Sequence, residues 1–204
     1  MIEYQIIKRG INDDRVIQAM LSVPRHLFVP DDYLPYAYSD GPITIGFGQT
    51  ISQPYIVALM ISDIHLIGVE KVLEVGTGCG YQTAILAHLA KSIFSIEIIP
   101  ELAEVASKNI KKLHLENTTV ICGDGSLGYL NEAPYDAILI SAAAPKVPEP
   151  LLGQLADDGR LVVPVGSKSI QNLEIWHRRN DKNYMKKSIP VAFVPLRGKF
   201  GWSD

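Results

Sequence analysis

The segment 74–80 constrains the fold of this chain more than any other part of it. It reads Glu-Val-Gly-Thr-Gly-Cys-Gly and stands between a short apolar run at 72–75 and a helical pattern that starts at Tyr81. Glycines in such a place let the backbone turn sharply out of a strand and let a ligand approach the strand end closely. A single glycine pair would indicate only a turn, but three alternate glycines after an acid favour a nucleotide-type cofactor site.

Strand-like and helix-like segments alternate around this loop. We expect strands at 72–75, 92–98, 120–122, 137–140 and 161–163, and helices at 81–90, 101–114 and 148–155. Short apolar strands that alternate with helices are typical of a parallel sheet covered on both faces. Two further strand-like runs, 173–177 and 191–196, have no helix between them, so we expect them to close the sheet as an antiparallel pair.

The residues before this alternation follow a different pattern. They predict a short helix capped by Asn12 with apolar positions Val16, Ile17, Met20 and Leu21, an irregular segment 24–42, a loop 43–54, and a helix from Pro54 to about His65 capped by Ser52 or Gln53. The expected architecture is therefore a doubly wound α/β fold, with a mostly parallel, Rossmann-like sheet of the seven-stranded type and an N-terminal helical extension.

The chain of 204 residues suits a single domain. Within it we expect three parts: the helical and loop extension 1–53, a cofactor-binding βα core 54–166, and C-terminal strands 167–204 that line the substrate side.

Charge and composition narrow the classes of function. The formal net charge is −3, whereas a protein that binds a phosphate backbone usually carries a basic surplus. Nucleic acid is therefore not expected as a partner.

The chain shows no basic start followed by an apolar run and no stretch of about eighteen apolar residues, so neither a secretory signal nor a membrane span is expected. Cys79, Cys122 and five scattered histidines have no metal-ligand spacing. We expect a monomeric cytoplasmic protein that binds no metal.

Charge also indicates which cofactor the glycine loop suits. A dinucleotide loop reads GxGxxG and holds a pyrophosphate, but here Gly80 comes one residue early. Glu74 stands two residues before the first glycine, where an acid disfavours a pyrophosphate and favours a cation. Glu97 follows Gly76 by 21 residues, the offset at which an acid binds ribose hydroxyls, and Asp124 ends the next strand, where an adenine would lie. S-adenosylmethionine carries an amino group and a sulfonium but no phosphate, and it fits these acids better than NAD.

These acids and glycines resemble the motif set of the class I methyltransferases, and further segments resemble one family among them. Those segments are 48–54 (GQTISQP), 135–138, 142–145, 159–162, 164–166 and 193–196 (FVPL). From about residue 24 to 202 the chain resembles the protein-L-isoaspartate O-methyltransferases. The resemblance implies methyl transfer from S-adenosylmethionine, which leaves S-adenosylhomocysteine, to the free α-carboxylate of L-isoaspartyl residues in damaged proteins and peptides. It also implies that the ester collapses to a succinimide, which reopens as normal aspartate.

The resemblance assigns roles to individual residues as well. It implies that Ser52 is the active-site residue and that Thr50, Ile51 and Ser52 lie between methyl donor and acceptor. The cofactor is expected on Thr50, Ile51, Glu74, Gly76, Thr77, Gly78, Gly80, Glu97, Asp124 and Gly125, and the substrate on Ile51, Ser52, Val194, Pro195 and Leu196. Cys79 departs from the small polar residue of many relatives, which weakens any hydrogen bond expected from that side chain.

The implied reaction needs no general base. An α-carboxylate has a pKa of about 3.5 and is ionised at neutral pH. The chain has no evident Ser–His–Asp or Cys–His set, and this reaction requires none. The protein has to hold a carboxylate oxygen in line with the methyl carbon and exclude water. Ser52 has no evident activating partner, so we expect its hydroxyl to orient the carboxylate; its other interpretation is a helix cap before Pro54.

Other functions remain open from the residues alone. The main alternative is a class I methyltransferase that acts on RNA or a small molecule, although 141–144 reads Ser-Ala-Ala-Ala rather than a DPPY-like tetrapeptide and no Pro-Cys pair occurs. The run 124–128 approaches the GxSxG of hydrolases but begins with Asp. A non-enzymatic binding module would be expected to lose the glycines and acids, which are intact. Lys108, Lys111 and Lys112 are expected to form a solvated helix face.

Overall fold

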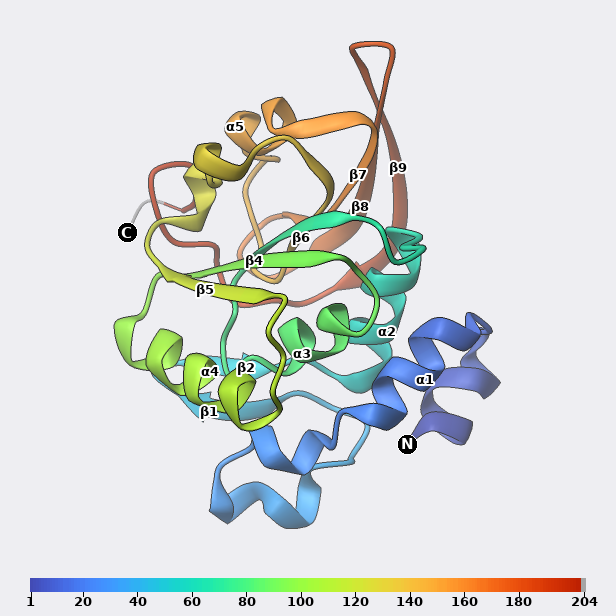
Figure 1. Ribbon diagram of the computed structural model, residues 1–204, viewed down its shortest axis with the longest axis vertical. Helices are drawn as coiled ribbons and strands as arrows, with labels where there is room; N and C mark the ends of the chain where they lie inside the picture. The colour runs from blue at the N-terminus through green and yellow to red at the C-terminus, as the bar shows by residue number, and fades with distance from the viewer. Residues whose placement is uncertain (203–204) are drawn as a thin grey trace.

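Seven strands form one sheet in the computed structural model, which describes residues 1–202 (Figure 1). Its order is β5-β4-β3-β6-β7-β8-β9. The parallel strands are β3 (Lys71–Val75), β4 (Ser92–Glu97), β5 (Thr118–Cys122), β6 (Tyr135–Ile140) and β7 (Leu155–Gly166), and the antiparallel ones are β8 (Gln171–Arg179) and β9 (Lys182–Val191). The predicted fold class is confirmed. Residues 203 and 204, the end of the predicted part 167–204, lie outside the described residues.

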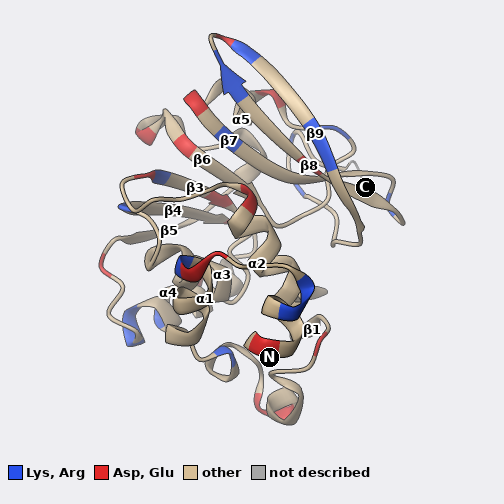
Figure 2. Cartoon of the chain, turned by 90° about the vertical axis from the view of Figure 1, so that its right-hand side faces the viewer, with Lys and Arg blue, Asp and Glu red and all other residues tan. Residues whose placement is uncertain are grey.

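Helices cover both faces of this sheet. The elements α1 (Asp14–Ser22), α2 (Pro54–Asp63), α3 (Tyr81–Ala87) and α4 (Pro100–Lys112) lie on one side, and α5 (Glu149–Gly153) lies on the other (Figure 2). Two buried apolar clusters follow from this arrangement. Val72 and Leu139 belong to the cluster beneath α1 to α3, whereas Leu73 and Ile138 belong to the cluster beneath α5. Successive residues of a strand point to opposite faces, so β3 and β6 read as continuous apolar runs.

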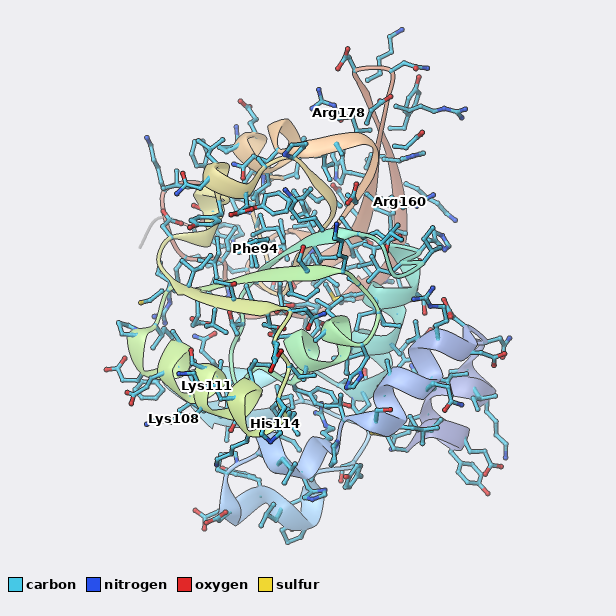
Figure 3. The ribbon with its side chains drawn as sticks, viewed as in Figure 1. Phe94, Lys108, Lys111, His114, Arg160 and Arg178 are labelled. Carbon is cyan, nitrogen blue, oxygen red and sulfur yellow. The ribbon has the colours of Figure 1, made fainter. Side chains whose placement is uncertain are left out.

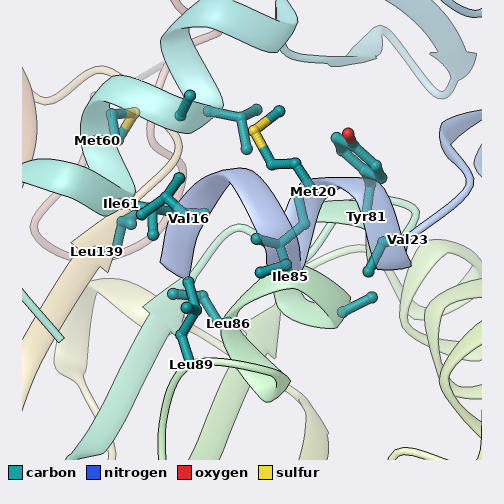
Figure 4. Packing of buried hydrophobic residues seen from close by; sticks show 14 of the residues in the cluster. Val16, Met20, Val23, Met60, Ile61, Tyr81, Ile85, Leu86, Leu89 and Leu139 are labelled. Atoms are coloured by element: carbon teal, nitrogen blue, oxygen red, sulfur yellow. The ribbon is translucent and has the colours of Figure 1, made fainter. Parts of the chain in front are cut away.

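The N-terminal helix α1 packs between α2 and α3. Its residues Val16 and Met20 lie among buried side chains of those helices, including Ile61 and Ile85 (Figure 4). The cap differs from the expected Asn12. The carboxylate of Asp13 accepts hydrogen bonds from the backbone N–H groups of Arg15 and Val16, at 3.0 and 3.4 Å, so the helix starts one residue later.

The predicted loop at 43–54 is instead a β-hairpin. The strands β1 (Ile43–Gly46) and β2 (Gln49–Ile51) pair antiparallel through a two-residue turn. Phe47 and Gly48 have φ values of 54° and 71°, which is the left-handed backbone that such turns require. The segment before it, predicted as irregular, contains the 3₁₀ turns Arg25–Phe28 and Asp31–Tyr36.

The C-terminal end of the sheet also differs from the prediction. An antiparallel pair closes the sheet as expected, but its last strand is Lys182–Val191 rather than 191–196. Residues 192–196 leave the sheet and run beside Ala143, whose N–H donates to Val194 O and whose carbonyl accepts from Leu196 N, both at 2.8 Å. Pro195 has no N–H to contribute to a ladder, so this apolar run contacts a loop instead.

Smaller differences concern the surface and the helix ends. α3 ends at Ala87 rather than at 90, and α5 is shorter than 148–155. Lys108, Lys111 and Lys112 are exposed on α4, as predicted, and Lys108 Nζ lies 2.6 Å from Glu104 Oε1 (Figure 3 labels Lys108 and Lys111). Within residues 1–202, no helix is long and apolar enough to cross a bilayer.

Candidate functional site

One cavity lies at the carboxyl ends of β3, β4 and β6, where ligands bind in sheets of this kind. Its empty volume is about 810 Å³, which includes space open to solvent. The cavity brings together most of the predicted site residues: Thr50, Ile51, Ser52, Gly76, Thr77, Gly78, Glu97, Gly125, Val194, Pro195 and Leu196. Three predicted cofactor residues, Glu74, Gly80 and Asp124, do not line it.

The glycine loop forms one wall of the cavity through its backbone. Gly76 N donates to Ile96 O at 2.8 Å, and Gly78 N donates to the Glu97 carboxylate at 2.8 Å. Gly80 lies behind the wall and adopts a φ of 88°. A Cβ on Gly80 would lie 3.4 Å from Ala106 in α4. Gly80 therefore permits the turn into α3 and its close packing on α4, rather than contact with a ligand.

Glu97 closes β4 and is the one Asp or Glu among the residues that line the cavity. Its Oε2 accepts from Gly78 N at 2.8 Å and its Oε1 accepts from Ile99 N at 3.0 Å. These bonds fix the carboxylate against the loop. Because each carboxylate oxygen has two lone pairs, both retain acceptor capacity for the hydroxyls of a ligand.

Glu74 is fully buried beneath α3 and acts through its neighbours. It accepts hydrogen bonds from Gln82 Nε2 at 3.0 Å, from Ser95 Oγ at 2.7 Å and from Thr83 Oγ1. Burial raises the pKa of Glu74 to about 7, although these hydrogen bonds oppose the rise. The Gln82 amide also donates to Ser141 Oγ at 2.6 Å, and both of these side chains line the cavity. The structure thus places Glu74 behind Gln82 rather than against a ligand.

The Asp124 carboxylate is occupied by backbone and side-chain donors. Its Oδ1 accepts from the N–H and hydroxyl of Ser126, at 2.9 and 2.6 Å, and its Oδ2 accepts from Lys199 N at 2.8 Å. The C-terminal segment is thereby held over this corner, and Trp202 Nε1 donates to Ala143 O at 2.9 Å. Gly125, the next residue, does line the cavity. A Cβ there would lie 2.6 Å from Val75 Cγ1.

Sequence reasoning missed five polar residues that line the cavity, namely Gln49, Tyr81, Gln82, Ser141 and Arg197. The sequence did carry a signal for Gln82, because a buried amide near the start of a helix needs a hydrogen-bond partner.

Arg197 is exposed and is the one Lys or Arg of the lining. A pyrophosphate would therefore meet Glu97 and no buried cation in this lining. The donor set fits S-adenosylmethionine, an adenosine-bearing cation without phosphate.

A second pocket adjoins the first and shares Thr50 and Ser52 with it. Its remaining lining residues are Pro42, Gln53, Ile56, Pro190, Val191, Ala192 and Phe193. Ser52 therefore stands where the two pockets meet. It does not cap α2, because the N-cap residue is Gln53 and no side chain makes a capping hydrogen bond there.

Comparison with known proteins agrees with this geometry. The family described as protein-L-isoaspartate(D-aspartate) O-methyltransferase matches residues 1–201. The protein-L-isoaspartate O-methyltransferase of Picosynechococcus sp. is 52% identical over 198 residues, which cover 97% of this chain and 89% of that protein.

Solved structures give the same result. One protein-L-isoaspartate O-methyltransferase superposes with a TM-score of 0.87 at 29% identity, covering 96% of this chain; this chain spans 64% of the length of that one. A putative protein-L-isoaspartate O-methyltransferase from Plasmodium falciparum, in complex with S-adenosyl-L-homocysteine, gives a TM-score of 0.83 at 27% identity and 94% coverage of both chains. The family model matches residues 1–201, and the relative from Picosynechococcus sp. is 52% identical in sequence. This chain therefore belongs to the protein-L-isoaspartate(D-aspartate) O-methyltransferase family.

Proposed function

We propose that this chain is a protein repair enzyme that transfers a methyl group from S-adenosylmethionine to the α-carboxylate of L-isoaspartyl residues, with Ser52 as the residue that orients the acceptor. The observation that carries the proposal is the place of Ser52. It lies at the junction of a cavity walled by the glycine loop and a second pocket lined by residues 190–193. A family match over residues 1–201 supports the same activity.

S-adenosylmethionine, when bound, supplies a methyl group activated by a positively charged sulfur. The residues that would hold it are the loop 76–78, with Glu97 for its hydroxyls and Gly125 for its base. Gln82 and Ser141 line the same cavity, and the Gln82 amide donates to Ser141 Oγ at 2.6 Å. The loop glycines and Glu97 keep their predicted roles in this proposal, whereas Gly125 takes the place predicted for Asp124 at the base.

The acceptor carboxylate arrives ionised, so the chain has no proton to remove. In this proposal the Ser52 hydroxyl donates a hydrogen bond that turns one carboxylate oxygen toward the methyl donor. Ile51, Val194 and Leu196 add apolar surface around the junction and keep water away from the transfer. Positioning and exclusion of water are the contributions that such a reaction takes from the protein.

Substitution of Ser52 by alanine tests this role. A hydrogen bond to a charged group contributes about 1.5–3 kcal/mol, so Ser52→Ala is expected to lower kcat about tenfold or more. The affinity for S-adenosylhomocysteine should stay within about threefold, because the hydroxyl faces the acceptor. Ser22→Ala, on the exposed end of α1, is the matched control. An unchanged kcat in Ser52→Ala would refute the orienting role.

We further propose that the substrate is protein rather than nucleic acid and that the chain acts as a monomer in the cytoplasm. The net charge of −3 and the single Lys or Arg in the cavity lining support a protein substrate. Cys79 and Cys122 are free thiols, which supports a reducing compartment. Chromatography on a sizing column gives the oligomeric state.

A further inference from the structure

Arg25 is a fully buried arginine in the 3₁₀ turn Arg25–Phe28. Its Nε donates to Ala37 O at 2.9 Å and its Nη2 donates to Ser52 O at 2.8 Å. The guanidinium carbon lies 4.9 Å from the centre of the Tyr81 ring. Ser52 and Tyr81 both line the cavity. Arg25 thus joins the N-terminal extension to the backbone of Ser52 and to one wall of the site.

The charge of Arg25 has no ionic partner within residues 1–202. No Asp or Glu lies within ion-pair distance of it, and its Nη1 has no hydrogen-bond partner. The charged and titratable groups that face it are Tyr81, Cys79 and Tyr38. Burial lowers the pKa of Arg25, yet arginine stays protonated in proteins. An isolated buried charge is costly, and buried charges in proteins are normally paired.

The reaction of the proposed function brings the missing partner to this wall. Its acceptor is an anion before transfer and a neutral ester afterwards. A fixed positive charge behind Ser52 attracts the ionised acceptor and not the product. It is also already in place before the acceptor binds, because carbonyl groups on two segments hold the guanidinium.

We infer that Arg25 is a positioning residue of the acceptor site: it fixes the Ser52 backbone and supplies the buried positive charge that draws the isoaspartyl carboxylate to Ser52. This inference rests on the proposed function. Its kinetic signature follows from the charge change. The attraction to the carboxylate is fully present when the substrate binds and weakens as the carboxylate charge is neutralised, so Arg25 lowers KM for the peptide and does not accelerate the transfer step.

Binding of two peptides to the enzyme loaded with S-adenosylhomocysteine tests the inference by calorimetry. One peptide carries an L-isoaspartyl residue, and the other is identical except that the α-carboxylate is a primary amide. The quantity of interest is the ratio of the two dissociation constants, measured in wild type, Arg25→Lys, Arg25→Gln and Arg25→Met. Arg197→Gln is the matched control, because it removes the exposed cation of the same cavity.

We expect wild type and Arg25→Lys to prefer the carboxylate, and we expect Arg25→Gln and Arg25→Met to lose about tenfold or more of that preference. Arg197→Gln should change the ratio less than about threefold, because water screens an exposed charge. The peptide KM should rise in Arg25→Gln with kcat kept within about threefold, while the affinity for S-adenosylhomocysteine stays unchanged.

Three results would overturn the inference: equal ratios in wild type and Arg25→Gln, a larger effect from Arg197→Gln, or a fall in kcat without a rise in KM. If the neutral variants do not fold, wild type and Arg197→Gln decide: equal affinity of wild type for the two peptides, or loss of the preference in Arg197→Gln, overturns the inference, whereas a preference kept in both proteins supports it. Failure of the proposed function gives a different result, since the wild type would then not methylate the isoaspartyl peptide at all.

Discussion

The buried carboxylate of Glu74 gives the most quantitative prediction about this fold. Glu74 is completely covered by α3 and β4, and burial raises its pKa from 4.5 to about 7. A carboxyl group whose pKa is raised in the folded state stabilises the fold when protonated. That contribution is complete below pH 4.5 and is lost as the pH rises through 7. Between pH 5 and pH 8 the loss amounts to about 2.5 kcal/mol for this one group.

Glu74→Gln removes the ionisation and keeps an oxygen that can accept from Gln82. Because wild type loses this stability and the variant does not, the free energy of unfolding of the variant should increase relative to that of wild type by about 2.5 kcal/mol between pH 5 and pH 8. Urea denaturation at both pH values, followed by tryptophan fluorescence, measures this difference. Glu104→Gln on the exposed face of α4 is the control. Lys108 lowers the pKa of Glu104, so that group is ionised at both pH values and the control difference should not change.

A difference that is the same at pH 5 and pH 8 would refute the reasoning, because it would mean that Glu74 titrates as an ordinary carboxyl. The affinity for S-adenosylhomocysteine separates two roles for this residue. If Glu74 acts only behind Gln82, the dissociation constant of Glu74→Gln stays within about threefold of wild type. If its carboxylate meets the cationic ligand directly, the constant rises about tenfold or more.

Three further predictions follow from particular contacts. Gly80→Ala is expected to cost about 1–2 kcal/mol of unfolding free energy, because its φ of 88° strains a residue that has a Cβ. Gly153→Ala, where a new Cβ would meet open space, should cost nothing, and equal urea midpoints of the two variants would contradict this reasoning. Glu97→Gln is expected to weaken S-adenosylhomocysteine binding about tenfold in calorimetry, through loss of a charged acceptor, and unchanged affinity would remove Glu97 from the site. A thiol reagent at pH 8 should label the exposed Cys122 and spare Cys79, whose pKa burial raises to about 11, until the protein is unfolded; two labels on the native chain would disagree with the structure.

The central strands were predictable from the sequence because both of their faces are buried. The run 137–140 is apolar at every position, and a strand covered by helices on both sides has no solvent-facing position to break the pattern. The glycine loop was predictable for a related reason, since its positive φ angles at Gly76, Gly78 and Gly80 admit few other residues.

The orientation of Glu74 was not predictable, because a strand end alternates its side chains between two faces. Glu74 shares a face with Val72, and that face is covered by α3, so the carboxylate points under the helix rather than toward a ligand. The position of Asp124 depends on Lys199, 75 residues later in the chain, which no local pattern encodes. The hairpin at 43–51 was hidden because Phe47 adopts a left-handed backbone that its residue type does not announce.

Ser52 lines both pockets of the site, and its proposed role is a prediction. Two of its features needed the structure: the junction of two pockets, and the hydrogen bond from Arg25 to its carbonyl. The sequence indicated Ser52 only through the resemblance of segment 48–54 to the family.

In the proposed activity, the protein methylates the α-carboxylate of isoaspartyl residues in this cavity. Incubation with methyl-labelled S-adenosylmethionine and two peptides that differ only in one residue, isoaspartyl or aspartyl, tests it directly. We predict label in the isoaspartyl peptide alone, released as methanol by mild base because the product is an ester. Label in neither peptide, or label transferred to RNA instead, would contradict the account.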